Sequence, residues 1–206
     1  MPIITDLFYL PPIEYFVSIL GHKEIIVDGT ENYQKQTYRN RARILLTNKV
    51  EILSIPVFGG SKERAYKEIK IDYGQKWKNV HLRGIQSAYG KAPFFEFFFP
   101  YLEEIYNKNL TFLFDHNFEL LTVCLKLLQL DTKVSIGFGQ GNISDYVDKR
   151  GTINTKEEFT ARSIMTGYEY SQMFGVNFVP NLSVLDLLFC QGTESKEILV
   201  RSKKND

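Results

Sequence analysis

The densest group of charged and hydrogen-bonding side chains in this 206-residue chain lies between positions 31 and 43. If this segment is extended, its side chains alternate between two faces. One face then carries the cations and the other carries amide and hydroxyl groups. The cationic set is Lys35, Arg39, Arg41 and Arg43, and the second set is Gln36, Tyr38 and Asn40. Guanidinium groups bind phosphate or carboxylate through paired hydrogen bonds, so the pattern indicates an anion site.

A diphosphate or a phosphopantetheine group would fit such a site. The alternative is a solvated edge strand whose charges prevent aggregation, which is a common use of cations on a sheet edge. The chain as a whole has a net charge of only +1. Because no global field draws it to nucleic acid or to a membrane surface, any electrostatic specificity must be local.

Strands are expected mainly in the first half of the chain and helices in the second. The predicted strands are residues 3–10, 24–28, 41–47, 51–57, 66–72 and 133–136, with a hairpin turn at Asn48-Lys49. Residues 13–20 and 183–189 are predicted helices, the latter capped by Asn181. Two apolar stripes at helical spacing predict longer helices. They are Trp77, His81, Ile85 and Ala88, and Leu110, Phe114, Phe118, Leu121, Leu125 and Leu128.

These elements predict one α/β (or α+β) domain over residues 1–206, with a mixed sheet packed by helices. Aromatic residues make up 14% of the chain, which indicates either an aromatic-rich core or a platform for a stacked ligand. No stretch has the length of a membrane-spanning helix, and the N-terminus lacks the pattern of a secretory signal. Cys124 and Cys190 are expected to be reduced thiols in a cytoplasmic protein.

Several blocks of the sequence, in order, carry a resemblance to a known family. They are residues 10–16 (LPPIEYF), Glu31 and Tyr33 with 35–41 (KQTYRNR), 53–57 (LSIPV), Trp77, His81, 88–89 (AY), 93–96 (PFFE), 170–174 (YSQMF), 180–183 (PNLS) and 185–189 (LDLLF). Together they resemble the WbqC-like family, in the form associated with Bacteroidetes members. One departure is Cys190, where the family typically has asparagine.

The resemblance implies a cytoplasmic protein encoded among O-antigen or capsule genes. It suggests transfer of an acyl or aminoacyl group to an amino sugar. This reaction requires a base that accepts the amine proton and hydrogen-bond donors that stabilise the developing oxyanion. A nucleotide-sugar and an acyl-CoA or carrier-protein donor are the partners this reaction would require. The resemblance also implies a substrate site formed by Glu31, Lys35, Gln36, Tyr38, Arg39, Asn40, Arg41, Tyr170, Gln172, Asn181 and Asp186.

His81 is the leading candidate for the base, since it falls in a matched block. Its place on a helix face with Trp77 and Ile85 equally suits a buried core histidine. Cys190 is a weaker candidate for a nucleophile, because it departs from the family pattern. Three scattered histidines without metal-ligand spacing predict no metal site, and no cofactor is predicted. The glycine-rich residues 137–142 lack the spacing of a phosphate loop and are predicted to form a turn.

Two hypotheses follow. In the first the protein is a transferase, with phosphates held by Lys35, Arg39 and Arg41. In the second it is a non-catalytic protein that binds a nucleotide-sugar or a partner enzyme. An exposed His81 in a cleft with Arg39 and Arg41 favours the enzyme, and a packed His81 favours the binding protein. The closing block is expected to meet the cationic segment, with Asp186 paired to an arginine. The oligomeric state is left open by the sequence.

Overall fold

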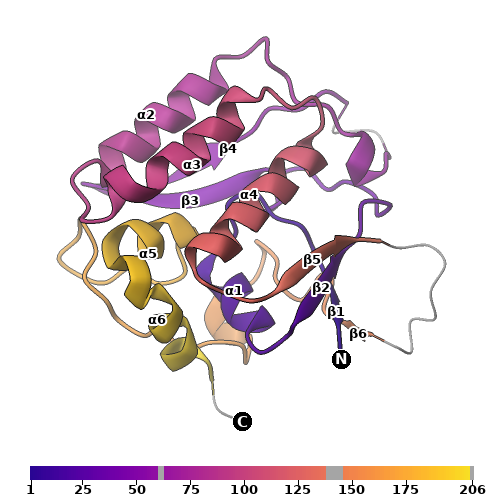
Figure 1. Ribbon diagram of the computed structural model, residues 1–206. Coiled ribbons are helices and arrows are strands. Elements are labelled where there is room, and N and C mark those ends of the chain that lie inside the picture. The colour runs from indigo at the N-terminus through magenta and orange to yellow at the C-terminus, as the bar shows by residue number, and fades with distance from the viewer. Residues whose placement is uncertain (60–62, 138–145, 205–206) are drawn as a thin grey trace.

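The computed structural model describes residues 1–59, 63–137 and 146–204 (Figure 1). Its main sheet has four parallel strands in the order β5-β2-β1-β6. These strands are β1 (Ile3–Thr5), β2 (Glu24–Val27), β5 (Lys133–Ile136) and β6 (Val147–Asp148). The chain adds β2 and β5 on one side of β1 and then returns to place β6 on the other. The order of strands therefore reverses between β1 and β6, and ligands bind at such a point in open α/β sheets.

A separate antiparallel hairpin joins β3 (Arg41–Leu46) to β4 (Lys49–Ser54). Leu46 pairs with Lys49, so Thr47 and Asn48 form the turn. Ala42 and Ile44 are buried on the inner face of β3, which is the alternation expected of a half-buried strand. The predicted α/β class is confirmed, with the parallel and antiparallel pairs in two different sheets.

Six α-helices lie among the described residues. They are α1 (Ile13–Ile19), α2 (Trp77–Tyr89), α3 (Phe95–Asn107), α4 (Leu113–Leu127), α5 (Val184–Gln191) and α6 (Ser195–Ser202). Figure 1 shows α2 and α3 beside the hairpin, with α5 and α6 near α1. The first apolar stripe is confirmed as the buried face of α2. Of the second stripe, Phe114, Leu121 and Leu125 are buried on α4, Phe118 is half-buried, Leu128 is buried just after the helix, and Leu110 precedes it. Cys124 is completely buried on α4, as a core thiol should be. No helix in the described ranges is long and apolar enough to cross a membrane.

The first predicted strand is shorter than expected. β1 ends at Thr5, and Leu10 has a φ of 41°, which no strand residue adopts. The Tyr9 N–H donates to the carbonyl of Tyr38 at 2.8 Å, outside the sheet. The chain leaves the sheet because residues 7–10 turn into the core, where all four side chains are buried.

Two other local predictions are wrong. Residues 66–72 form no regular strand, since Tyr66–Glu68 is a short 3-10 helix followed by isolated bridges. Ser183, not Asn181, caps α5 by accepting the Leu185 N–H at 3.4 Å. Asn181 has a φ of 54° and instead accepts the Glu14 N–H at 3.0 Å. In the predicted turn at 137–142, all positions after Gly137 lie outside the described residues.

A buried ion pair joins the first helix to the C-terminal part of the chain. Arg162 donates to both carboxylate oxygens of Glu14 at 2.7 Å, and Asn181 adds a third hydrogen bond at 3.2 Å. The Glu14 side chain has no exposed surface and that of Arg162 is 7% exposed. Removing one member of such a pair leaves the other charge buried without compensation.

We therefore expect Arg162→Met to lower the free energy of unfolding by about 3–5 kcal/mol in urea denaturation. Glu14→Gln in the Arg162→Met background should recover part of this loss, because no charge then remains buried. The matched control is Arg201→Met, which removes an exposed pair with Glu197 and should cost less than about 1 kcal/mol. Equal costs for the two arginine substitutions would contradict a buried Glu14–Arg162 pair.

Candidate functional site

A cavity of about 720 Å³ lies at the carboxyl ends of β1 and β6. Asp6 directly follows β1, and Asp148 ends β6. Both line the cavity, which therefore occupies the point where the strand order reverses. The full lining is Asp6, Phe8, Glu31, Asn32, Gln34, Thr37, Tyr38, Arg39, Asp148, Arg150, Gly151, Ile153, Asn154, Thr155, Lys156 and Glu157.

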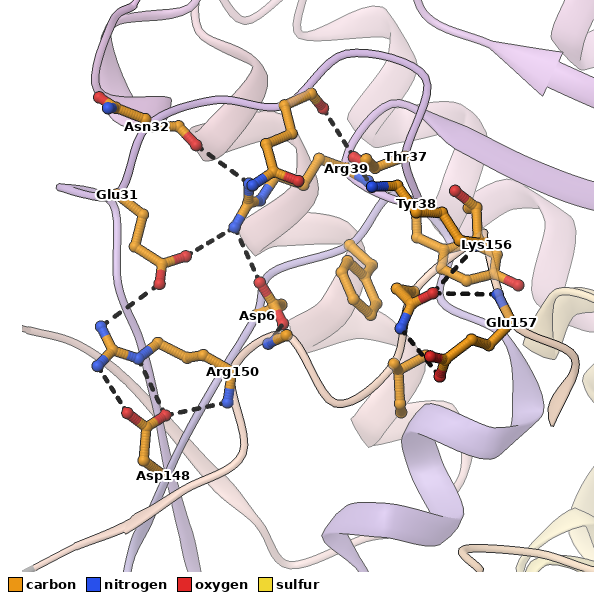
Figure 2. Close-up of a pocket in the computed structure, with 16 residues that line it drawn as sticks. Asp6, Glu31, Asn32, Thr37, Tyr38, Arg39, Asp148, Arg150, Lys156 and Glu157 are labelled. Atoms are coloured by element: carbon orange, nitrogen blue, oxygen red, sulfur yellow. Dashed lines mark hydrogen bonds and ion pairs between the residues drawn. The ribbon is translucent and has the colours of Figure 1, made fainter. Parts of the chain in front are cut away.

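Arg39 connects two acids on one side of this main cavity (Figure 2). Its Nη2 lies 2.9 Å from Asp6 Oδ1 and 2.6 Å from Glu31 Oε2. Its Nη1 donates to the backbone carbonyl of Asn32 at 3.2 Å. The Arg39 side chain is only 8% exposed. The guanidinium charge is thus compensated inside the protein.

Arg150 extends the network from the other side of Glu31, as Figure 2 shows. Its guanidinium lies 2.9 Å from Asp28 Oδ2, 3.4 Å from Glu31 Oε1 and 2.7 Å from Asp148 Oδ2. The hydrogen bonds from Arg150 lower the pKa of the Asp148 carboxyl. Both carboxylate oxygens of Glu31 therefore contact a guanidinium.

The balance of charge in the main cavity is slightly acidic. Asp6, Glu31, Asp148 and Glu157 carry four negative charges, and Arg39, Arg150 and Lys156 carry three positive charges, giving a formal net of −1. Burial raises the pKa of the Glu31 carboxyl above its usual value, and the charge of Arg39 opposes that rise. The remaining polar groups are neutral amides and hydroxyls. This lining suits a hydroxyl-rich ligand with a positive charge better than a phosphate.

The cationic face predicted for residues 35–43 is wrong. Residues 35–40 form turns, and the strand begins only at Arg41. Gln36 has a φ of 62°, which breaks the alternation. Lys35 is exposed, while Arg39 is buried against Glu31 of the same segment and against Asp6, which is 33 positions away. A local pattern cannot reveal a partner such as Asp6, because folding supplies it.

A smaller cavity of about 330 Å³ adjoins the main one through Tyr38, Thr155 and Glu157, which line both. Gln36, Arg41, Arg43 and Asn181 also line this adjoining cavity. Of the predicted site residues, Glu31, Tyr38 and Arg39 thus line the main cavity, and Gln36, Arg41 and Asn181 line the adjoining one. Lys35 and Asn40 line neither. The Asn40 side chain is buried and donates to the Ile55 carbonyl at 3.1 Å.

The closing block meets the cationic segment, though not as expected. The Ser183 N–H donates to the Arg43 carbonyl at 2.8 Å. The predicted Asp186–arginine pair is wrong. Asp186 Oδ2 instead accepts from Tyr170 Oη at 2.6 Å and from Gln172 Nε2 at 2.8 Å. Burial raises the pKa of the Asp186 carboxyl. Because its hydrogen bonds join residues of the closing block and it lines neither cavity, Asp186 stabilises the closing block.

His81 is packed in the core, in a cluster of aromatic rings that come from the segment between β1 and α1 and from the helices α2, α3 and α4. Its Nδ1 lies 2.8 Å from the Tyr9 hydroxyl, which in turn contacts the Tyr106 hydroxyl. The Trp77 ring lies edge-on, with centroids 5.1 Å apart. The residue is 2% exposed and lines neither the main nor the adjoining cavity. By the criterion set out above, this position favours the binding hypothesis.

Burial lowers the pKa of His81 to about 4, and a hydrogen bond with the backbone of Ser54 opposes the shift. A neutral ring with its proton on Nε2 satisfies the contacts, since Nδ1 then accepts from Tyr9. His116, on α4, belongs to the same cluster. Burial and the nearby charge of His81 lower its pKa to about 3.

Comparison with known proteins bears on this site only through the family. A model of the WbqC-like protein family matches residues 8–150 and 144–198. The chain belongs to the WbqC-like protein family. It is similar to an uncharacterized protein, Rv1507c, of Mycobacterium tuberculosis, with 27% identity over 221 aligned residues that cover 93% of this chain and 94% of the relative. No solved structure matches.

Sequence reasoning missed four of the six members of the ion-pair network in this WbqC-like protein: Asp6, Asp28, Asp148 and Arg150. Asp6 and Asp28 each follow an apolar strand directly, and Asp148 ends the strand beside β1. Acids at the carboxyl ends of neighbouring parallel strands converge on one edge of a sheet, so their spacing was a usable pattern for Asp6 and Asp28. Arg150 and Glu157 carry no such pattern, because they lie in an irregular region after β6.

The packed position of His81 has consequences for stability. We expect His81→Ala to lower the free energy of unfolding by about 3 kcal/mol, since it leaves a cavity and removes the Nδ1 acceptor of the Tyr9 hydroxyl. Both histidines bind protons more tightly when unfolded, so their contribution to stability is present above pH 6.5 and lost as the pH falls toward about 4 for His81 and about 3 for His116. The slope is at most about 1.4 kcal/mol per pH unit for each histidine.

Urea denaturation between pH 7 and pH 4.5 tests this. His81→Ala should show a shallower loss of stability on acidification than the parent protein. The control is Ile85→Ala, a buried neighbour on the same face of α2, which should lower stability and leave the pH slope unchanged. An unchanged slope in His81→Ala would mean that the imidazole is not buried as a neutral ring.

Proposed function

We propose that this protein binds an amino sugar in its main cavity and acts in the assembly of a surface polysaccharide. The assignment to polysaccharide assembly draws on membership of the WbqC-like family and on the gene context that the resemblance implies. The single observation that carries the ligand class is the pairing of Arg39 and Arg150 with acids, which leaves a polar and slightly acidic lining.

Charge separates an amino sugar from a phosphate as the ligand of this cavity. A phosphate would have to displace Asp6 or Glu31 from Arg39, and both contacts are short. An ammonium group meets no such cost, because it donates charge-assisted hydrogen bonds to carboxylates already at the surface of the cavity. Glu31 and Glu157 are the acids best placed, since each is partly or largely exposed.

Neutral groups in the same cavity suit the hydroxyls of a sugar. Amides and hydroxyls both donate and accept, as sugar hydroxyls do. They are supplied by Asn32, Gln34, Thr37, Asn154 and Thr155. Phe8 and Tyr38, whose ring centroids lie 5.5 Å apart, add a small apolar wall. A volume of about 720 Å³ falls within the range of small-molecule sites and has room for a substituted sugar.

The adjoining cavity offers a place for the rest of a nucleotide-linked sugar. Arg41 and Arg43 both line it, and within the described part of the chain neither forms a salt bridge. Their guanidinium groups suit a diphosphate. The sugar would then lie in the main cavity and the diphosphate beside it.

Calorimetric titration at pH 6, where the amine is protonated, tests the ligand class. We expect D-glucosamine to bind about tenfold to a hundredfold more tightly than D-glucose, the range for one hydrogen bond to a charged group. Glu157→Gln should remove much of this difference in affinity, because it removes a carboxylate that would accept from the ammonium group. The Glu157 side chain is exposed and can be replaced without disturbing the arginine network. The control is Glu103→Gln, an exposed acid on α3 outside the cavity.

Two results would contradict the proposed ligand. One is tighter binding of a free sugar phosphate than of glucosamine, which would mean that the main cavity is an anion site. The other is equal affinity for glucose and glucosamine, which would remove the role of the carboxylates.

A second candidate function is transfer of an acyl or aminoacyl group to the sugar amine. The observation that favours it is the position of Glu31 in the cavity lining, where burial raises the pKa of its carboxyl and so makes it a stronger proton acceptor than an exposed glutamate. The amine nitrogen would attack the carbonyl of a thioester donor, an acyl-CoA or an acylated carrier protein. The C–N bond forms and the C–S bond breaks. Glu31 takes the proton that the amine nitrogen loses and passes it to the leaving thiolate, which departs as the free thiol.

Release of free thiol from acetyl-CoA in the presence of glucosamine measures this reaction. Glu31→Gln should lower turnover by about 10²–10⁴-fold, the usual range for a general base, while Glu103→Gln keeps the parent rate. Glucosamine binding without thiol release from any acyl donor would leave the protein as a binder.

A further inference from the structure

A second cavity of about 310 Å³ adjoins the main one across Asp6, Phe8 and Ile153, which line both. Its cations come from two distant parts of the chain. Lys149 directly follows β6, and Lys203 and Lys204 directly follow α6. We call this the lysine cavity.

The backbone fixes the lysines in place. The Lys149 N–H donates to the Ile4 carbonyl at 2.8 Å, which continues the pairing of β6 with β1. Lys203 forms an isolated antiparallel bridge with Met165, and the Thr166 N–H donates to Ser202 at 2.8 Å. Backbone hydrogen bonds therefore bring Lys149 and Lys203 to the same cavity, whichever rotamers their side chains adopt.

Positive charge in the lysine cavity is not compensated as it is in the main cavity. In the described ranges, Lys149, Lys203 and Lys204 form no salt bridge, and Asp6 is the one acid of the lining. The Asp6 carboxylate is already occupied, since it accepts from Arg39 at 2.9 Å and from the Gly151 N–H at 2.7 Å. The Lys149 Nζ donates to the Ser18 carbonyl at 2.7 Å, and its pKa is lowered by burial and, second, by the charge of Lys203.

The rest of the lining has two parts. Ser18, Thr152 and Ser163 lie near the cations, and the Ser18 and Thr152 hydroxyls donate to the carbonyls of Tyr15 and Lys149. Val17, Leu20 and Ile164 form an apolar wall in the same cavity. A ligand that satisfies both parts has an anionic head and a short apolar chain.

We infer that the lysine cavity binds a phosphate monoester that carries an apolar chain. A dianionic phosphate is favoured over a carboxylate because the charge of three lysines exceeds what the single charge of one carboxylate neutralises. Lysine binds phosphate as a point charge and needs no fixed fork geometry. This inference does not rest on the amino-sugar proposal, since the two cavities differ in the sign of their uncompensated charge.

Titration with methyl, butyl and hexyl phosphate, followed by calorimetry, tests both parts of the site. Affinity should rise about three- to fourfold for each methylene that reaches the apolar wall. Hexanoate should bind at least about tenfold more weakly than hexyl phosphate, because it carries one negative charge in place of two. Binding should weaken as salt is added.

Variants locate the binding. The double substitution Lys203→Gln/Lys204→Gln should weaken hexyl phosphate at least about tenfold, since it removes two of three cations. Lys196→Gln, on α6 but outside the cavity, is the matched control and should bind as the parent does. Ile164→Asn should remove the gain from chain length and keep the affinity for methyl phosphate.

The outcomes separate this inference from the amino-sugar proposal. Glucosamine affinity should not change in Lys203→Gln/Lys204→Gln, and hexyl phosphate affinity should not change in Glu157→Gln. Equal affinity for hexanoate and hexyl phosphate, no dependence on chain length, or full binding by the double lysine variant would each overturn the phosphate ester assignment.

Discussion

The buried carboxylate of Asp6 is the group on which the arrangement of this site depends. One oxygen accepts from Arg39 and the other from the backbone N–H of Gly151. The end of β1 is thereby tied to the turn before β3 and to the segment after β6. A buried acid of this kind is stable only with its partners in place, because an uncompensated charge in the core costs several kcal/mol. The carboxylate thus fixes the position of Arg39 relative to Gly151, two residues that line the main cavity from different segments of the chain.

The same contacts divide the charge of a nearly neutral protein between two adjoining cavities. Arg39 and Arg150 are held by acids in the main cavity, while the lysines after β6 and α6 have no salt bridge in the described residues. Asp6, Phe8 and Ile153 line both spaces. A net charge of +1 over the whole chain therefore says little about either. What matters for a ligand is which cations the fold leaves without an acid.

Aromatic side chains serve mainly the core. Tyr9, Trp77, His81, Tyr106 and His116 form a buried cluster in which hydroxyl and imidazole groups contact one another. Such rings bury large apolar areas and keep their polar atoms paired where geometry allows. The imidazoles are neutral for the same reason, since a charge there would lose its hydration. In the main cavity, Phe8 and Tyr38 contribute only a small part of their surfaces.

The sequence by itself determined the elements whose residues repeat with a clear period. The stripes of α2 and α4 and the alternation of β3 are local patterns set by backbone geometry, so they could be read before any contact was known. The family, too, followed from short blocks in order. Residues 66–72 show the limit of this reasoning, because apolar composition alone does not distinguish a strand from a buried irregular segment.

Only the tertiary structure decided which charged groups are free to meet a ligand. Arg39 looked like a phosphate ligand in a cationic run, and its partners Asp6 and Glu31 made it part of the scaffold. His81 looked equally suited to catalysis or packing, and the depth of α2 in the core placed it among aromatic rings. The lysine cavity joins positions 18, 149, 163 and 203, which share no local pattern. Long-range ion pairing and burial are properties of the folded chain, and for that reason no window of sequence contains them.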